Sequence, residues 1–111
     1  MWKVSFYHDA RGRSPVIEYL DGLVARDRAR VARYLELVRE FGPRLAMPHA
    51  RHLDGGLWEL RPGAHRVIYA AVASERVVLL HAFRKKSQKT PRREIERARR
   101  CLAELEARGG C

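Results

Sequence analysis

Basic side chains recur in the second half of the chain where β-strands are predicted to begin and end. Between residues 53 and 90, short runs rich in Val, Leu, Ile, Tyr and Trp are separated by turn residues at Pro62-Gly63 and Ala73-Ser74-Glu75, the pattern of a β-meander. The cations that flank these runs are Arg61, Arg66, Arg84, Lys85, Lys86 and Lys89. Because cations gathered at one edge of a small sheet favour phosphate, the sequence predicts an anion-binding site on this meander.

The charge of the whole chain supports an anionic partner. Its 23 Lys and Arg against 13 Asp and Glu give a formal net charge of +10. The segment from residue 84 to 100 alone holds nine Lys and Arg against two Glu, a net +7. Nucleic acid, an acidic protein and an anionic membrane surface are the partner classes that such a charge favours.

Length and composition indicate a single small domain covering residues 1–111. Hydrophobic residues make up 46% of the chain, enough for a packed core. We find no apolar run of the roughly 20 residues that a membrane-spanning helix needs and no signal-peptide pattern at the N-terminus. Cys101 and Cys111 are expected to be reduced thiols. We therefore expect a cytoplasmic protein without a membrane partner.

The residues give no indication of a metal or cofactor. No spacing of His, Cys, Asp and Glu matches a metal site, and Gly55-Gly56 is a turn rather than a phosphate-binding glycine loop. His49, His52 and His65 fall in predicted loops or turns, so a solvent-exposed role is expected for each of them.

The first half of the chain predicts a scaffold of one strand and two helices. Residues 4–8 alternate as a β-strand does, and we expect this strand to pair with the later sheet. Ser14-Pro15 is a helix-start signal, and Asp27 is a candidate cap for a second helix that ends at Gly42-Pro43. Two amphipathic helices in succession predict a helical hairpin packed on the sheet.

The elements after this hairpin frame the meander. Residues 44–52 are predicted to be a loop, and residues 77–83, apolar on both faces, a central strand. Thr90-Pro91 is a second cap-plus-Pro signal for a C-terminal helix. The apolar positions of this helix recur in a narrow seam: Ile95, Ala98, Leu102 and Leu105.

Two stretches of the meander carry a family resemblance. The first is L-W-E-L-R at residues 57–61, followed by R-V-I-Y at residues 66–69. The second is L-L-H-A-F-R-K-K-S-Q-K-T-P at residues 79–91. With the predicted order of elements, they resemble the RelE/ParE toxin superfamily of bacterial toxin–antitoxin modules, and within it the HigB-like, phage-type branch.

The resemblance implies an α+β, microbial-RNase-like fold. Its sheet would have four mostly antiparallel strands, with the N-terminal helical hairpin on one face and the C-terminal helix at the side. It also implies a toxin that enters the ribosomal A site and cuts messenger RNA without a metal. The expected partners are the mRNA, the ribosomal RNA and an antitoxin, typically a helix-turn-helix protein similar to HigA.

Family catalytic positions can be placed only where the local pattern matches. The resemblance puts the basic residue that ends the first meander strand at Arg61 and the arginine of the next strand at Arg66. The basic residue after the last strand falls on Lys85 or Lys86. Some family members have a catalytic tyrosine a few residues later, but no tyrosine follows Tyr69 in this chain.

Metal-free RNA cleavage needs a base for the ribose 2′-hydroxyl, cations for the charged phosphorane, and an acid for the leaving 5′-oxygen. Arg61 and Arg66 suit the phosphate, because a planar guanidinium can grip two oxygens. Lys85 or Lys86 can donate a proton if neighbouring cations lower its pKa. Glu59 and His81 are the candidate bases, with a structural role as the alternative for His81. Further RNA contacts are expected from Arg84, Lys89, Arg51 and Arg44.

Two other functions fit the same residues. ParE-type members of the superfamily inhibit DNA gyrase, and they usually lack a concentrated cluster of catalytic cations. A basic module that binds nucleic acid or an antitoxin without cleaving anything is the second alternative, which stays open because no tyrosine follows Tyr69.

Overall fold

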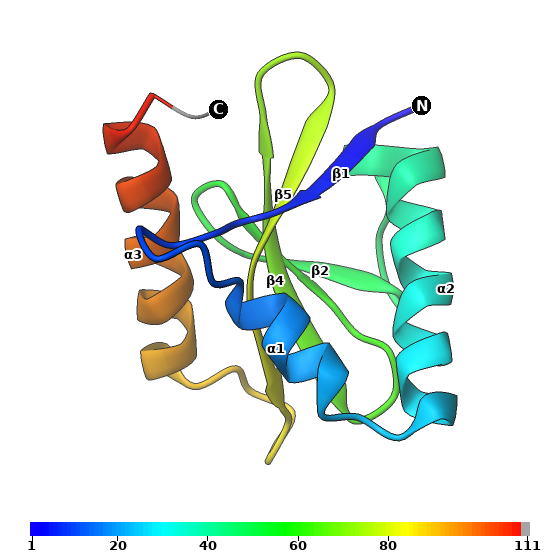
Figure 1. Cartoon of the computed structure of the whole chain (residues 1–111). Coiled ribbons are helices and arrows are strands. Elements are labelled where there is room, and N and C mark those ends of the chain that lie inside the picture. Colours follow the sequence, from blue (N-terminus) through cyan, green and yellow to red (C-terminus); the bar gives the residue numbers. More distant parts are fainter. Residues whose placement is uncertain (110–111) are drawn as a thin grey trace.

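The computed structural model describes residues 1–109. The elements follow the chain as β1 (Lys3–Phe6), α1 (Pro15–Asp21), α2 (Ala25–Phe41), the 3-10 helix η1 (Gly42–Arg44), β2 (Ala50–Asp54), β3 (Leu57–Leu60), β4 (His65–Val72), β5 (Arg76–Arg84) and α3 (Arg92–Ala107) (Figure 1). This order contains the predicted strand, two helices, meander and C-terminal helix. Cys111 lies outside the described residues.

The sheet has five strands in the order β1-β5-β4-β3-β2, one more than predicted. Only β1 is parallel to its neighbour, with Val4 beside Val77 of β5. The additional strand is β2, whose residues fall largely within the predicted loop. Its outer face is polar and only Ala50 is fully buried. An edge strand needs few apolar residues, so its alternation did not stand out in the sequence.

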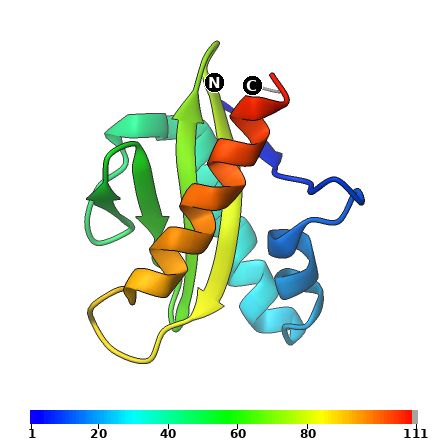
Figure 2. The same ribbon diagram turned by 90° about the vertical axis from the view of Figure 1, so that its left-hand side faces the viewer.

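Helices cover both faces of the sheet. Apolar residues of α1 and α2 pack with one set of strand residues that includes Val67, Tyr69 and Leu79. The seam of α3 packs on the other face, against a set that includes Ile68 and Leu80, and Figure 2 shows α3 lying across that face. The predicted position of α3 at the side was therefore wrong, because the apolar second face of the central strands needs a cover.

One of the three predicted helix caps is observed. The Ser14 hydroxyl accepts a 3.2 Å hydrogen bond from the Ile17 N–H at the start of α1. The other two predictions were wrong: Val24 precedes α2 and Pro91 precedes α3, and neither makes a side-chain capping bond. Asp27 and Thr90 instead bond to strand residues. Each of these side chains therefore bonds to a residue far away in the sequence instead of to the backbone at a helix start.

The end of α2 confirms its predicted glycine. Gly42 follows Phe41 with φ of 54°, a left-handed conformation that glycine adopts without strain. A Cβ at this position would overlap the indole of Trp2. Gly42 therefore allows the N-terminal segment to pack against the end of α2.

No helix among residues 1–109 is long and apolar enough to cross a membrane. Within the same range, no three His, Cys, Asp or Glu residues are grouped so as to hold a metal ion. Cys101 is a half-buried residue of α3 that packs toward the sheet, and burial raises the pKa of its thiol.

Candidate functional site

Three adjacent strands bring charged side chains together on the face that α3 covers. Arg51 of β2 lies opposite Glu59 of β3, and Glu59 lies opposite Ile68 of β4, a residue of the core beneath α3. Arg66 lies two residues before Ile68 on the same face. We call Arg51, Glu59, Arg61 and Arg66, together with the segment from Lys85 to Pro91 that crosses over them, the cation cluster.

Glu59 is the buried centre of the cation cluster, with a side chain that is 1% exposed. Its Oε2 atom accepts a 2.6 Å hydrogen bond from the hydroxyl of Thr90. Its Oε1 atom lies 3.5 Å from Nη2 of Arg51 and 3.9 Å from Nε of Arg66. Both carboxylate oxygens therefore have partners, which is the condition for burying a charged group in a stable fold.

Arg66 is held beside Glu59 with only 6% of its side chain exposed. Its Nη1 atom donates 2.8 Å hydrogen bonds to the carbonyl oxygens of Gly63 and His65. Burial is the main cause that lowers the pKa of Arg66, and the neighbouring Arg61 lowers it further. Arginine stays charged under such shifts, so the cluster contains a fixed positive charge in a poorly solvated position.

The segment after β5 is tied to the sheet by arginines. The Nη2 atom of Arg51 donates to Thr90 Oγ1 at 3.0 Å and to the Gln88 carbonyl at 3.5 Å. Arg61, which is partly exposed, donates to Oε1 of Gln88 at 3.4 Å. The sequence did not single out Gln88, and Thr90 was expected to be a cap. Both now bridge the segment and the sheet.

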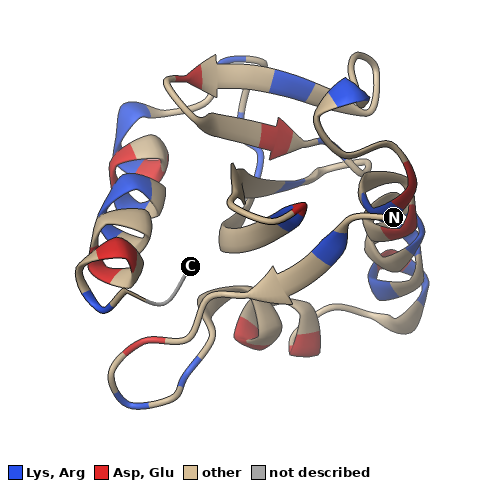
Figure 3. Ribbon diagram, turned by 90° about the horizontal axis from the view of Figure 1, so that it is seen from above, with Lys and Arg blue, Asp and Glu red and all other residues tan. Residues whose placement is uncertain are grey.

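The lysines predicted for the site lie along this segment. Lys85 is partly buried, and its backbone N–H bonds to the Ala64 carbonyl at 2.8 Å. Arg84, Lys86 and Lys89 are exposed. Basic segments also lie on both long helices, α2 and α3 (Figure 3).

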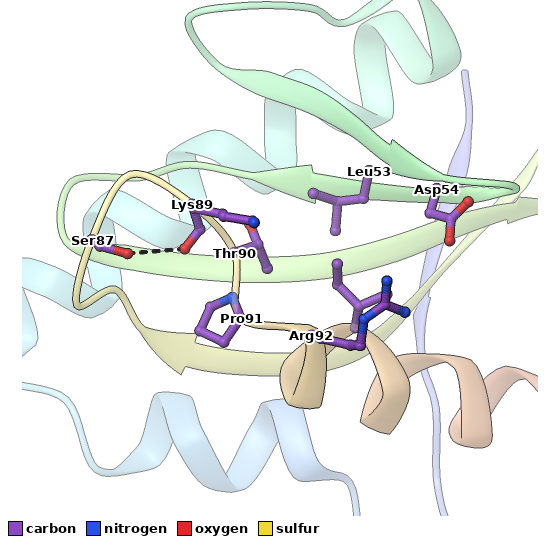
Figure 4. Close-up of a pocket in the computed structure, with 8 residues that line it drawn as sticks. Leu53, Asp54, Ser87, Lys89, Thr90, Pro91 and Arg92 are labelled. Atoms are coloured by element: carbon purple, nitrogen blue, oxygen red, sulfur yellow. Dashed lines mark hydrogen bonds between the residues drawn. The ribbon is translucent and has the colours of Figure 1, made fainter.

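A pocket of about 510 Å³ lies between β2 and the start of α3, and it borders the cation cluster at Thr90. Figure 4 shows Leu53 and Asp54 of β2 on one side and Thr90, Pro91 and Arg92 on the other. The hydroxyl of Ser87 donates a 3.1 Å hydrogen bond to the carbonyl of Lys89, and both residues line the pocket. The pocket therefore adjoins the cation cluster along the segment that precedes α3.

Arg44 lies apart from the cluster, whereas His81 borders it and lines a pocket together with Lys86 and Pro91. His81 is on β5, and its Nε2 atom is 2.6 Å from Oε1 of Glu94 on α3. The side chain is 12% exposed, and its ring stacks on that of Phe83. Arg44 is exposed at the end of η1 and makes no hydrogen bond or ion pair with the cluster in the described part of the chain.

The prediction that His65 is solvent-exposed was wrong. His65 is the first residue of β4 and is 3% exposed. Its Nδ1 atom lies 2.7 Å from the hydroxyl of Tyr19, and its Nε2 atom lies 3.0 Å from Oδ2 of Asp27. These partners are 46 and 38 residues away in the sequence, so no local pattern could have indicated them.

Chemically, the cation cluster can bind phosphate and stabilise negative charge that develops on it. Arg61 and the lysines of the segment are accessible to a ligand, whereas Arg66 supplies a positive charge from its buried position beside Glu59. A low-dielectric setting strengthens the effect of such a preorganised charge.

The chain is similar to one protein family and to several solved structures. A family model described as "Phage derived protein Gp49-like" matches residues 18–103. A search of the curated proteins gave no match.

Several solved structures share the fold. The toxin–antitoxin complex RelBE2 of Mycobacterium tuberculosis contains a chain with 21% identity and a TM-score of 0.56, covering 76% of this chain and 98% of that one. A mutant of E. coli RelE toxin in the free state has 17% identity and a TM-score of 0.51, covering 86% and 96%. The isolated E. coli RelE toxin has 17% identity and a TM-score of 0.50, covering 87% and 98%. The fold predicted from the resemblance is confirmed, with five strands in place of four.

Proposed function

Because the chain belongs to the family of phage-derived Gp49-like proteins, we propose that it is the toxin of a type II toxin–antitoxin pair. In this proposal it inhibits translation by cutting messenger RNA on the ribosome. Three observations support it: the fold shared with RelE toxins, the net charge of +10, and the cation cluster on the sheet.

The observation that carries the proposal is the pairing of buried and accessible cations around Glu59. Arg66 and Arg51 approach its carboxylate from both sides, while Arg61 lies on the same strand face two residues further on. This arrangement holds the guanidinium groups in place before a ligand arrives. Preorganised cations stabilise a charged transition state without a reorganisation cost at the moment of reaction.

The proposed reaction is transfer of the phosphate within the RNA strand. The 2′-oxygen attacks phosphorus, the bond to the 5′-oxygen breaks, and the products are a 2′,3′-cyclic phosphate and a free 5′-hydroxyl. Arg61 and Arg66 neutralise the phosphorane, and Lys85 or Lys86 supplies the proton for the 5′-oxygen. The proton of the 2′-hydroxyl passes to a base.

Of the two candidate bases, His81 suits the role better. Glu59 has both oxygens engaged by Thr90 and the arginines, so we assign it the task of holding Arg51 and Arg66. His81 carries an imidazole ring, the side chain most often used for general acid–base catalysis, and Glu94 orients that ring from Nε2.

The proposed partners follow from the exposed cations of the chain. Ribosomal RNA and mRNA are polyanions that the exposed cations Arg84, Lys86, Lys89 and Arg44 can contact, and such contacts make binding strongly dependent on salt. An antitoxin, which we expect to be a helix-turn-helix protein similar to HigA, would neutralise the toxin in the cytoplasm.

The test is induced expression in bacteria without an antitoxin, followed by mapping of the 5′ ends of cellular mRNA. We expect growth arrest and new 5′ ends inside translated codons, both lost with Arg66→Ala. Growth arrest with intact mRNA and altered DNA supercoiling would instead indicate a gyrase inhibitor. If growth continues although the protein is shown to accumulate, the chain is a module that binds without cleaving RNA.

A further inference from the structure

A second polar series lies on the other side of the sheet from the cation cluster. It joins Tyr19 of α1, His65 of β4 and Asp27 of α2 through contacts of 2.7 Å and 3.0 Å. The rings of Tyr19 and His65 meet edge to face with centroids 5.7 Å apart. The proposed cleavage does not use this series, and burying a histidine among polar partners is costly unless each contact is satisfied.

The chemistry of Asp27 sets the direction of these hydrogen bonds. The bond from His65 lowers the pKa of the Asp27 carboxyl, so Asp27 is an ionised acceptor at neutral pH. Nε2 of His65 then carries a proton and donates it to Asp27, and we assign Nδ1 as the acceptor of the Tyr19 hydroxyl proton. In this arrangement the single hydroxyl proton of Tyr19 points to His65. The Tyr19 oxygen therefore meets a ligand only as a hydrogen-bond acceptor.

Tyr19 lines a pocket of about 290 Å³ at the edge of β5. The parallel pairing of β1 with β5 ends at Leu79, so within residues 1–109 no strand pairs with β5 on this side from Leu80 to Arg84. Phe83 and the His81–Glu94 pair form part of the wall. Four cations from β5, the following segment and α3 complete it: Arg84, Lys86, Arg93 and Arg97.

We propose that this pocket binds one nucleotide of single-stranded RNA, with the four cations at its phosphate and the Tyr19 oxygen accepting a hydrogen bond from its ribose 2′-hydroxyl. DNA lacks this donor, so the pocket favours RNA over DNA. The inference rests on the proposed function, in which RNA is the substrate. It adds Tyr19 and the arginines of α3 to the RNA-recognising residues, in a pocket that also contains His81 and Lys86 of the proposed cleavage.

The test is a binding measurement that needs neither ribosome nor cleavage. A fluorescein-labelled RNA hexamer and the DNA hexamer of matched sequence are titrated with the whole protein and followed by fluorescence anisotropy. One hydrogen bond contributes about 0.5–1.5 kcal/mol net, so we expect RNA to bind about two- to tenfold more tightly. A gel run after the titration verifies that the RNA is intact.

Tyr19→Phe should reduce the RNA affinity to that for DNA and leave the DNA affinity unchanged. Arg84→Ala and Arg97→Ala should weaken RNA and DNA binding equally and reduce the salt dependence by about one ion each. Arg76→Ala, at the opposite end of β5, makes the same charge change away from the pocket and is the matched control. Its effect should be clearly smaller.

The inference is overturned if Tyr19→Phe keeps the preference for RNA, or if Arg84→Ala and Arg97→Ala do no more than Arg76→Ala. The two arginine variants replace exposed side chains, so they decide the phosphate part even if Tyr19→Phe folds poorly. A preference for RNA that depends on Tyr19, in a protein that cuts no mRNA in cells, would refute the proposed cleavage and keep this site.

Discussion

Thr90 donates a 2.6 Å hydrogen bond to Glu59, a residue 31 positions earlier in the chain. Both side chains are buried, and Arg51 approaches both of them. This contact fixes the segment between β5 and α3 over the sheet, and with it the lysines that the proposed cleavage needs.

Thr90→Val should loosen this segment, because valine matches the shape of threonine but cannot donate to Glu59. A buried carboxylate that loses one hydrogen bond costs about 1–3 kcal/mol, measured as the free energy of unfolding in urea. Thr90→Ser keeps the hydroxyl and should lose much less. Equal losses in the two variants would show that the hydroxyl bond is not what stabilises the segment.

Glu59→Ala should be the more damaging change, because it leaves Arg66 buried without its acidic partner. Removing one member of a buried ion pair typically costs about 3–5 kcal/mol. Glu36→Ala, which removes an exposed acid paired with Arg39 at 4.0 Å, should change the unfolding free energy by less than about 1 kcal/mol. A small loss for Glu59→Ala would mean that Glu59 does not hold the arginines.

Tyr69→Phe should leave stability unchanged or raise it by up to about 1 kcal/mol. The hydroxyl of Tyr69 is buried and has no hydrogen-bond partner within residues 1–109, and burial raises its pKa to about 12. Removing an unsatisfied polar group removes its desolvation cost. Tyr7→Phe is the control, because the Tyr7 hydroxyl donates to Glu104 at 2.6 Å and its removal should destabilise. Thermal unfolding of both variants compares the two.

The contact between Asp27 and His65 should make stability depend on pH at the acid side. The pKa of Asp27 is lowered in the folded protein, so its contribution is complete above the ordinary value near pH 4 and is lost as pH falls through the folded pKa. The difference in unfolding free energy between the wild type and Asp27→Asn should therefore shrink below pH 4. Asp21→Asn, at an exposed acid of α1, should show no such trend. A difference that stays constant with pH would contradict the assignment.

The sequence predicted the elements well where the signal was local. Ser14 before Pro15, and Gly42 before Pro43, mark helix ends through bonds and backbone angles set within a few residues. The apolar residues of β4 and β5 indicated central strands for the same reason. The edge strand β2 was not predicted, because its polar outer face hides the alternation that marks a strand.

The sequence indicated which cations would gather on the meander, but it did not indicate the side-chain partners that hold them. Arg61 and Arg66 were named from their places at the ends of strands, and the fold brings them together. The roles of Thr90, Gln88 and His65 depend on partners 27 to 46 residues away, which only the register of the sheet and the path of the last segment determine.

The central claim is that this chain cuts ribosome-bound mRNA through attack by a ribose 2′-hydroxyl. The most direct measurement adds the purified protein to ribosomes programmed with a short labelled mRNA, beside the same mRNA carrying one 2′-deoxynucleotide at the cut position. We expect cleavage of the first at that position only on the ribosome, none of the second, and a loss of about 100-fold in rate with Arg66→Ala. An uncut mRNA, or cleavage of the 2′-deoxy mRNA at the same bond, would contradict the account.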